Sequence, residues 1–520
     1  MSVLGPLSGS LLLDFVLLLF ALYISACIRS YRHLKHIPGP NLWAWSVIPL
    51  FWTHLRGDIF DKFDDLNRQY GPLVRIAPKT LLVSDPEVLR RMSAARSPYT
   101  RSDWYLAMRL IPGKDNVLST RDEKHHDDLR RKMASGYSGK ENPSLEQDID
   151  ECVLDLVKLI DTKYLNLHPG QVVRTDLARK IQYFTSDIMS KLAFDAKFND
   201  LSEDKDNFGY IHEVETIFPS IFCTCTIPAV VTFLTSIGFL KLFAPSVNST
   251  FGLGKVLGIT RSQVAKRFDK NGKPEVEHKD MLASFIRHGL SQEEAEQESV
   301  MQLAAGSDTT ATGLRATLLC IITNPRVHTK LLAEIDQRRL SGETTSSSNS
   351  IISDQEAREL TYLQACIKEG LRWYPPIAGM LSKKTPAEGD TLCGYPVPGN
   401  VSIGYSAKAV HRSATLFGPD EDVFRPERWI HKDQGGDETS ADKLKAMERN
   451  NELVFGHGKY QCLGKSVAAL ELNKVIFELL RRYQITLVNP TQPWVSSCYG
   501  IHLQRDMWVT IRGRRQTYDG

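Results

Sequence analysis

The chain is 520 residues long and 42% hydrophobic, which is enough apolar material for a large buried core. Its 64 Lys and Arg nearly balance 61 Asp and Glu, and it has no long basic stripe of the kind that binds nucleic acid. We therefore expect no nucleic-acid partner. The nine cysteines form neither CxxC pairs nor a zinc-type spacing with histidine, which favours free thiols in a reducing compartment.

The N-terminal segment is predicted to be a membrane anchor, because residues 11–28 are apolar except for Asp14 and a few small polar residues. About 18 residues at roughly 1.5 Å each just span a bilayer core. No Lys or Arg precedes this run, whereas Arg29 and Lys35 follow it, an order that holds the following chain in the cytosol and is unlike a cleaved signal peptide. Residues 1–36 are interpreted as a single-pass anchor with a basic flank.

The sequence Ile37-Pro38-Gly39-Pro40 ends this segment, since its prolines fix the backbone and remove amide donors. Residues 37–520 are predicted to form one large domain. The Ser/Thr-rich stretch 341–350 and the charged stretch 432–451 are interpreted as surface loops within it. A second uncharged run, 217–240, contains prolines and polar residues and is expected to be buried or to contact a membrane shallowly.

The body of the chain is predicted to be mainly α-helical with small β-sheets. The clearest strand candidates are residues 73–76, 81–84 and 508–512. The longest predicted helix begins at a Ser-x-x-Glu capping box at Ser291 and continues until Pro325 forbids it. At about 33 residues it is long enough to cross the whole domain.

The middle of this helix reads Ala-Gly-Ser-Asp-Thr-Thr from Ala305 to Thr310. Glycine in a helix interior costs about 1 kcal/mol relative to alanine, and a threonine hydroxyl can bond to the carbonyl one turn earlier. A local bulge is therefore expected here. Taken alone, Asp308 and Thr309 are equally typical of a polar patch on a buried helix.

A glycine-rich loop containing Cys462 leads into another predicted helix. Residues 455–464 read Phe-Gly-His-Gly-Lys-Tyr-Gln-Cys-Leu-Gly, and a proline-free stretch continues to Tyr483. Gly456 and Gly458 permit tight turns and close approach to a flat ligand. The cysteine is predicted to lie where the helix begins, so that unpaired amides and the positive helix end favour the thiolate. A cysteine considered alone is more often a small buried hydrophobe.

This loop resembles the haem loop of the cytochrome P450 family, whose pattern is Phe-x-x-Gly-x-(Arg or His)-x-Cys-x-Gly, and the resemblance extends from about residue 37 to the C-terminus. The resemblance implies the cytochrome P450 fold and haem b as cofactor. It also implies that Cys462 is the axial ligand of the iron and that Phe455, Gly458 and Gly464 belong to the haem-binding loop.

Tyr460 departs from that pattern, because the family usually has Arg or His there to meet a haem propionate. Lys459, Lys383 and Lys465 are the candidate substitutes, and the sequence leaves open which one serves. The loop, together with Tyr-Thr-Arg-Ser-Asp-Trp-Tyr at 99–105, is similar to a fungal subgroup of which pisatin demethylase is an example.

Three further motifs resemble elements of the same family. Glu369 and Arg372 are three residues apart on one helical face and match its ExxR motif, while Arg428 matches the PERF element. The resemblance implies a buried ionic triad behind the haem, whereas a lone pair of this kind is usually a surface salt bridge. His126 and Arg130 are similar to its Trp-x-x-x-Arg helix, which implies a propionate contact for Arg130; a basic surface turn is the alternative.

The Ala-Gly-x-Asp-Thr-Thr segment is similar to the oxygen-binding turn of the family, which implies that Asp308 and Thr309 are the proton-delivery pair. The implied activity is insertion of one oxygen atom from O2 into a lipophilic small molecule. No flavin or dinucleotide motif is present, so NADPH-cytochrome P450 reductase, with cytochrome b5 as a further candidate, is expected to supply the electrons. The cations expected to attract an acidic donor are Arg131, Lys132, Lys459 and Lys465.

Mainly apolar segments are expected by analogy to line the substrate pocket, which favours a lipophilic guest. These segments are 104–111, 301–305, 377–381 and 498–501. The expected location is the endoplasmic reticulum membrane with a cytosolic catalytic domain, and the expected setting is fungal secondary metabolism, with a terpenoid or polyketide substrate. Two alternatives stay open: a haem-thiolate isomerase or dehydratase that does not use O2, against which Asp308 and Thr309 argue, and a non-catalytic haem-binding protein.

Overall fold

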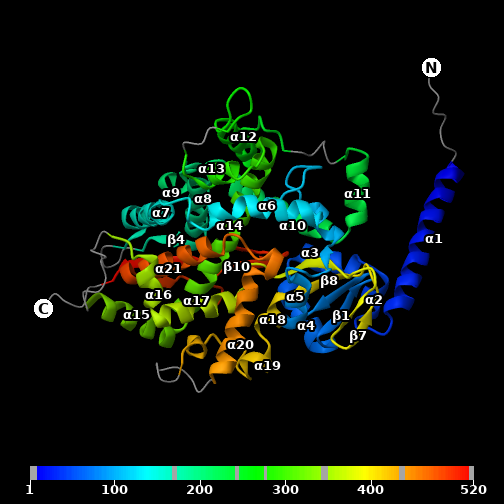
Figure 1. Ribbon diagram of the computed structural model, residues 1–520. Coiled ribbons are helices and arrows are strands. Elements are labelled where there is room, and N and C mark those ends of the chain that lie inside the picture. The colour runs from blue at the N-terminus through cyan, green and yellow to red at the C-terminus, as the bar shows by residue number, and fades with distance from the viewer. Residues whose placement is uncertain are drawn as a thin grey trace.

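The computed structural model describes residues 9–166, 172–239, 245–274, 278–340, 350–431 and 440–514. Helices dominate these residues, and their strands form small sheets (Figure 1). The architecture is the mainly helical class with small β-sheets that the sequence predicts.

The largest sheet lies on the side of the molecule where the chain begins and has the strand order β1-β2-β8-β5-β3 (Figure 1). Its strands are β1 (Leu73–Ala77), β2 (Thr80–Val83), β3 (Thr100–Arg101), β5 (Gly379–Lys384) and β8 (Ser402–Ser406). β2 and β8 run parallel, while the other neighbours are antiparallel. The nearby helices are α2 (Asn41–Trp45), α3 (Ile48–Arg56), α4 (Ile59–Tyr70), α5 (Pro86–Ser93) and α18 (Ala407–His411). The predicted strands 73–76 and 81–84 are confirmed.

The centre of the molecule is crossed by the long helix α14 (Gln292–Ile322). The predicted capping box is present, because the Ser291 side chain accepts from the Glu294 amide and the Glu294 side chain accepts from the Ser291 amide. The helix ends three residues before Pro325. It packs against α8 (Leu177–Phe194), α12 (Gly252–Ala265), α17 (Thr361–Trp373) and α21 (Lys465–Arg482).

The remaining elements surround this helix. The helices are α6 (Glu123–Tyr137), α7 (Leu145–Leu159), α9 (Asp200–Glu203), α10 (Tyr210–Cys225), α11 (Pro228–Ser236), α13 (Met281–Arg287), α15 (Pro325–Leu340), α16 (Asp354–Glu359), α19 (Ala414–Phe417) and α20 (Ala441–Asn451), with the short turns η1 (Asp103–Met108), η2 (Ile160–Tyr164), η4 (Pro426–Trp429), η6 (Glu452–Phe455) and η7 (Gly458–Tyr460). The smaller sheets are β4 (Arg174–Asp176) with β12 (Trp508–Gly513) and β9 (Tyr483–Leu487), β10 (Val495–Cys498) with β11 (His502–Arg505), and β6 (Asp390–Leu392) with β7 (Tyr395–Val397). The predicted strand 508–512 is confirmed as β12.

The first helix, α1 (Gly9–Leu34), ends before the proline-rich segment, as predicted. Its last turns pack on the large sheet rather than standing free. Leu34 is buried in one cluster with strand residues of β1 and β2, and the Ser30 hydroxyl donates to the carbonyl of Pro78. The Tyr31 ring stacks on Trp45 with centroids 4.4 Å apart. Contacts therefore cross the predicted boundary at residue 36.

The structure tests several loop predictions. Residues 341–349 and 432–439 lie outside the described residues, but the end of the predicted charged loop, 441–451, is the helix α20 capped by Ser440. The run 217–240 is broken into α10 and α11 just before Pro228, whereas Pro219 lies inside α10. Among the described residues, no helix by itself combines the length and hydropathy of a bilayer span; α10 and α11 reach them only as a pair, bent by 103°.

Candidate active site

The Cys462 loop is shaped by two glycines. Gly456 and Gly458 have φ values of 73° and 56°, a region that residues with a Cβ rarely adopt. A Cβ on Gly458 would also lie 2.2 Å from a carbonyl oxygen of the adjacent α5 segment. The Cys462 amide donates to the Phe455 carbonyl over 2.7 Å, which closes the loop. Helix α21 begins at Lys465, three residues later than predicted.

Cys462 is the one of the nine cysteines whose residue is exposed, although protein surrounds its thiol. All nine cysteines are free; Cys393 is half-buried and the other seven are buried. Crowding by protein raises the pKa of the Cys462 thiol, while the amides of Gly464 and Lys465 and the Arg130 guanidinium act in the opposite direction. The amides lower the pKa of this thiol as predicted, but desolvation raises it by more. A metal cation bound to the sulfur would stabilise the thiolate further.

In the middle of α14, Ala305, Gly306 and Thr309 form an accessible stripe within the otherwise buried stretch 298–321. The Thr309 hydroxyl donates to the Ala305 carbonyl over 2.8 Å. The segment nevertheless stays α-helical, so the predicted bulge is absent from it. Gly306 has a different purpose: a Cβ there would lie 2.4 Å from the sulfur of Met189, so the glycine lets α8 approach α14 closely.

Asp308 points away from this stripe towards α8. Its carboxylate is buried and accepts a hydrogen bond from the Gln182 amide over 3.0 Å. The same Gln182 side chain accepts from Arg315 over 2.5 Å, which places a cation near the acid. Burial raises the pKa of Asp308 to about 6, although the charge of Arg315 opposes this shift. Asp308 and Thr309 are thus neighbours in sequence, and no hydrogen bond joins them in the described structure.

Glu369, Arg372 and Arg428 come together in a fully buried ion cluster. Arg372 donates to both Glu369 oxygens over 2.8 Å, and Arg428 donates to one of them over 3.1 Å. The Trp429 indole and the Arg425 amide supply further hydrogen bonds to the same carboxylate, each of 2.8 Å. With all its lone pairs engaged, Glu369 keeps its charge, and its pKa lies below the usual range despite burial.

Several cations surround Tyr460, the residue that differs from the haem-loop pattern of the family. The Arg101 guanidinium lies 5.0 Å from its ring centroid, the Lys383 amine 4.8 Å and the Lys459 amine 5.2 Å. Arg130 lies near this cluster: burial and then the charge of Arg101 lower its pKa. Lys459 is paired with Glu123 over 2.7 Å, and the Tyr460 hydroxyl donates to that same carboxylate.

His126 also borders this cluster, with its ring 5.2 Å from that of Tyr460. Among the residues that the structure describes, its buried Nε2 has no partner, and burial, together with the charges of Arg101 and Arg130, lowers its pKa to about 3. Arg101 itself was not predicted as a site residue. Segment 99–105 carries only a subgroup resemblance, and no local sequence signal shows that the Arg101 side chain reaches Tyr460.

The cluster fits a ligand with two carboxylates next to an iron-binding thiol. Arg101 carries a buried, unpartnered Nε, and no hydrogen bond of the Arg130 side chain occurs in the described part of the chain. Positive charge thus exceeds negative charge at this place. Of the three candidate substitutes, Lys383 and Lys459 lie in the cluster, whereas Lys465 pairs with Glu452 over 3.1 Å. Haem, with two propionates and an iron, matches this donor set.

Lys383 is predicted to make haem retention pH-dependent. Burial and the charges of Arg101 and Lys459 lower its pKa to about 7, and a propionate beside it would raise that pKa. Haem loss must then release a proton above about pH 7, so loss should become faster as pH rises. We expect the transfer of haem to a scavenging haem protein to accelerate from about pH 7 to pH 9. Lys383→Met should flatten this profile, and an unchanged slope in that variant would contradict the assignment.

Three of the four segments expected to line the substrate pocket lie together in the structure. The Trp104 ring lies 6.1 Å from Phe222 of α10, and Ile377 and Ile501 form an isolated antiparallel bridge. Met380 adopts a φ of 59°, an unusual conformation for a residue with a side chain. The structure therefore joins segments 104–111 and 377–381 to the hairpin turn 498–501 through mainly apolar side chains.

The site combines a cysteine just before a helix N-terminus with a cluster of cations that can bind carboxylates. It also has an accessible polar stripe on a long central helix. Together these features are those of a haem-thiolate protein. The family model of cytochrome P450 matches residues 37–505. The chain belongs to the cytochrome P450 family; it binds haem and is a monooxygenase.

Several fungal relatives support this assignment. The chain is 41% identical to "Cytochrome P450 monooxygenase ABA1" of Pyricularia oryzae, over 94% of each protein. It is 37% identical to "Cytochrome P450 monooxygenase aba1" of Botryotinia fuckeliana over 92% of each, and 34% identical to "Cytochrome P450 monooxygenase abl1" of Leptosphaeria maculans over 90% of this chain and 81% of that protein.

Proposed function

We propose that this protein is a membrane-bound monooxygenase of the fungal endoplasmic reticulum that oxidises a lipophilic small molecule, a terpenoid or polyketide, in secondary metabolism. NADPH supplies the electrons through a reductase. The observation that carries the proposal is the accessible Thr309 hydroxyl on α14, one turn from Ala305, in a protein whose exposed cysteine is Cys462. The fungal relatives that are named as monooxygenases support the proposed role in a fungus.

The residues of α14 suit proton delivery. Haem supplies oxygen activation when bound, and the reaction requires two protons for each oxygen atom inserted. The Thr309 hydroxyl lies on the accessible stripe and can pass a proton. Asp308, whose pKa burial raises to about 6, exchanges its proton close to neutral pH, and the charges of Glu215 and Arg179 act on it. Arg179 of α8 pairs with the partly exposed Glu215 over 3.1 Å.

For Thr309→Ala we expect haem binding to persist while coupling fails. The variant loses the hydroxyl without adding volume, so the product formed per NADPH should fall several-fold, with hydrogen peroxide accounting for the missing electrons. Product, NADPH and peroxide should be measured with added reductase and the same lipophilic substrate. Thr310→Ala removes a buried hydroxyl from the next position and serves as the control. Full coupling in Thr309→Ala would contradict the role of this hydroxyl.

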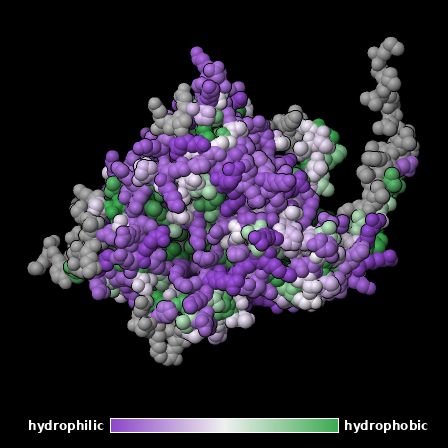
Figure 2. Space-filling view, viewed as in Figure 1, coloured by the Kyte–Doolittle hydropathy of each residue, from purple (hydrophilic) through white to green (hydrophobic). Residues whose placement is uncertain are grey.

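Membrane attachment is supported by apolar surface on one side of the molecule. Phe233 of α11 and Ile237, which follows that helix, are 61% and 58% exposed, and Ile48 and Trp52 of α3 are 68% and 56% exposed. Figure 1 places α11 and α1 on the same side, and Figure 2 shows apolar surface at α11 and beside the lower end of α1. A basic flank, with Arg29 and neighbours, suits the cytosolic face of a bilayer.

The proposed electron donor would approach the cysteine side. The four cations predicted to attract it are ion-paired within the chain: Lys132 with Asp128 and Glu294, Arg131 with Asp128, and the other two as described above. Arg131 is nevertheless 72% exposed and can exchange its partner. We expect mutations of this residue to change the association rate and its salt dependence rather than the chemistry.

The decisive experiment separates oxygen insertion from the alternatives. The purified holoprotein is mixed with candidate terpenoids and polyketides, with and without NADPH and reductase. A product that gains one oxygen atom only in the complete mixture supports the proposal. A product that forms without NADPH would indicate an isomerase or dehydratase, and absence of turnover with every metabolite that accumulates on gene deletion would favour a haem-binding role.

A further inference from the structure

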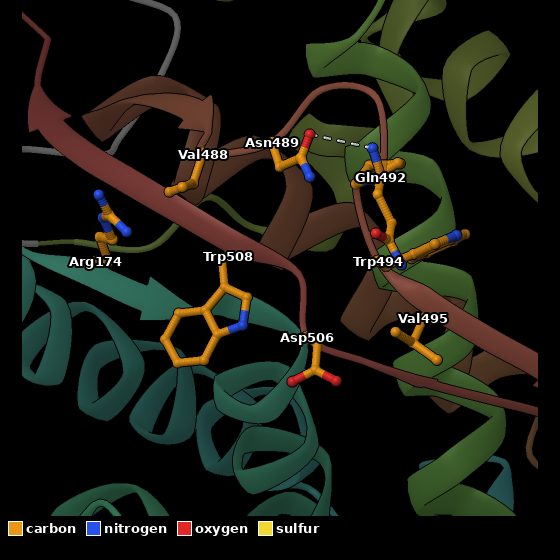
Figure 3. A pocket seen from close by; sticks show the side chains of 9 residues that line it. Arg174, Val488, Asn489, Gln492, Trp494, Val495, Asp506 and Trp508 are labelled. Atoms are coloured by element: carbon orange, nitrogen blue, oxygen red, sulfur yellow. Dashed lines mark hydrogen bonds between the residues drawn. The ribbon is translucent and has the colours of Figure 1, made fainter.

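A surface pocket of about 440 Å³ lies between β12 and the chain that joins β9 to β10 (Figure 3). Arg174, Asp506 and Trp508 are among the residues that line it, and none of its lining residues belongs to the four segments expected to line the substrate pocket. The predicted substrate pocket is therefore a different place. One of its segments, 104–111, continues into residues 109–121, which are called the 109–121 loop below.

The 109–121 loop lies where two apolar clusters meet. Leu118 packs against the cluster that contains Trp104 and Ile501, residues of the predicted substrate pocket. Its neighbour Val117 packs instead against the main cluster, to which the apolar residues of α14 belong. Because the two residues are adjacent, the position of Val117 determines how Leu118 packs in the wall of the substrate pocket.

Val117 is held by hydrogen bonds on both its backbone groups. Its amide donates to the Glu298 carboxyl of α14 over 2.8 Å. Its carbonyl accepts from Arg101 over 2.7 Å, and the Arg101 guanidinium also lies beside Tyr460 in the cation cluster described above. Val117 therefore connects the central helix to the cations around Tyr460.

Glu298 is buried on the side of α14 that faces the active site. It is 1% exposed and lies seven residues before Ala305, which is two helical turns, or roughly 10 Å, along the same face. A second contact between the loop and this helix is the ion pair of Lys114 with Glu293 over 2.7 Å, whose side chains are 42% and 64% exposed. Exposed pairs contribute little, so the buried hydrogen bond of Glu298 is the stronger of the two contacts.

The surroundings of Glu298 favour its neutral form. Burial raises its pKa to about 8, and the charge of Glu294 one turn earlier adds to this shift, while the Val117 amide and Arg101 oppose it. Burial also raises the pKa of Tyr137 on α6, so that this phenol is neutral. The cations of the neighbouring helices are paired with other carboxylates: Lys132 of α6 with Glu294, Arg261 of α12 with Glu296, and Arg287 of α13 with Glu141. Ionisation of Glu298 would bury a poorly compensated charge behind the loop and therefore opposes docking.

We propose that Glu298 is a positioning residue: through Val117, its protonated carboxyl docks the 109–121 loop onto α14 and so fixes one wall of the substrate pocket. In this role Glu298 acts on a substrate only through the loop. Its effect on substrate binding rests on the proposed function, whereas the docking of the loop does not.

Hydrogen exchange of the 109–121 loop in the full-length holoprotein tests the docking. The ordinary pKa of a glutamate, 4.5, lies below that of the docked carboxyl, so the docked state binds the extra proton. Docking is therefore strongest at acidic pH and weakens as the pH rises to about 8. Relative to Glu298→Gln at the same pH, the exchange of the peptide that contains Val117 should rise several-fold between about pH 6 and pH 8.5. The comparison at each pH cancels the chemical dependence of exchange on pH.

Two substitutions separate positioning from simple packing. Glu298→Gln keeps an oxygen that accepts from Val117 but cannot ionise, so the loop should stay docked without a pH dependence. Glu298→Ala leaves the buried amide of Val117 unpaired, and exchange of the loop should rise several-fold at every pH. Glu293→Ala, which removes the exposed pair with Lys114, is the matched control and should change exchange little. Parallel pH profiles of the wild type and Glu298→Gln would overturn the proposal, even if Glu298→Ala does not fold.

Turnover then tests the effect on the substrate pocket. In Glu298→Ala the KM for the lipophilic substrate should rise several-fold with little change in kcat, and Glu298→Gln should restore the KM of the wild type at neutral pH. A fall in kcat at an unchanged KM would contradict the positioning of the pocket wall. If neither the wild type nor any variant shows turnover, the proposed function fails while the exchange result still stands.

Discussion

Replacing Cys462 with alanine is expected to abolish the red-shifted Soret band that reduced haem-thiolate proteins show with carbon monoxide, together with all monooxygenase turnover. The variant lacks the exposed cysteine at the head of α21, and the other cysteines are buried or half-buried, so none can take its place. The measurement is the carbon monoxide difference spectrum of purified protein, followed by turnover with NADPH and reductase.

Cys393→Ala is the matched control for this experiment. That thiol is the half-buried one, and burial raises its pKa to about 11, so it is a poor ligand. Its replacement should leave the spectrum unchanged. A thiolate-type Soret band that survives in Cys462→Ala, or a haem held by nitrogen in the wild-type protein, would disprove the assignment of the axial ligand.

Glu369→Ala is expected to produce the largest loss of stability. The substitution leaves Arg372 and Arg428 buried without their shared carboxylate, and stranding a buried charge in this way costs about 3–5 kcal/mol. The free energy of unfolding from denaturant titration should fall by about that amount, which is a large part of the usual margin of about 5–15 kcal/mol. The yield of soluble holoprotein should fall with it.

Lys368, next to Glu369 in sequence, provides the control for this stability measurement. Lys368 pairs with Glu448 at the surface over 2.6 Å, and both side chains are about two-fifths exposed, at 39% and 41%. Exposed ion pairs contribute about 0–1 kcal/mol, so Lys368→Ala should change stability little. An equal fall in the free energy of unfolding in the two variants would show that the buried triad contributes no more to stability than the surface pair.

Local sequence signals predicted much of the fold. The capping box at Ser291 and the stop at Pro325 define the ends of α14, because both act within one helical turn. The three-residue spacing of Glu369 and Arg372 likewise places them on one face, where the structure finds them in contact. The helix α20 was missed although its helix-forming residues follow a good cap at Ser440, so the signal was present and overlooked.

What sequence could not predict depends on contacts between distant segments. Arg101 reaches Tyr460 across more than three hundred residues, and Lys465 turns instead to Glu452. The orientation of Asp308 depends on Gln182 of another helix, and nothing near Asp308 reveals it. Gly306 was attributed to a bulge, whereas its purpose is set by Met189 on α8.

The docking of α1 constrains how the enzyme can be shortened. Cys27, Ser30 and Leu34 are buried at 4%, 5% and 1%, and Arg75 donates to Pro78 and to Ser30 beneath them. Deleting the whole of residues 1–36 would expose apolar side chains of the large sheet such as Leu73 and Leu81, which favours self-association. A shortened version that begins before Cys27 removes the apolar first part of the helix and keeps these side chains covered.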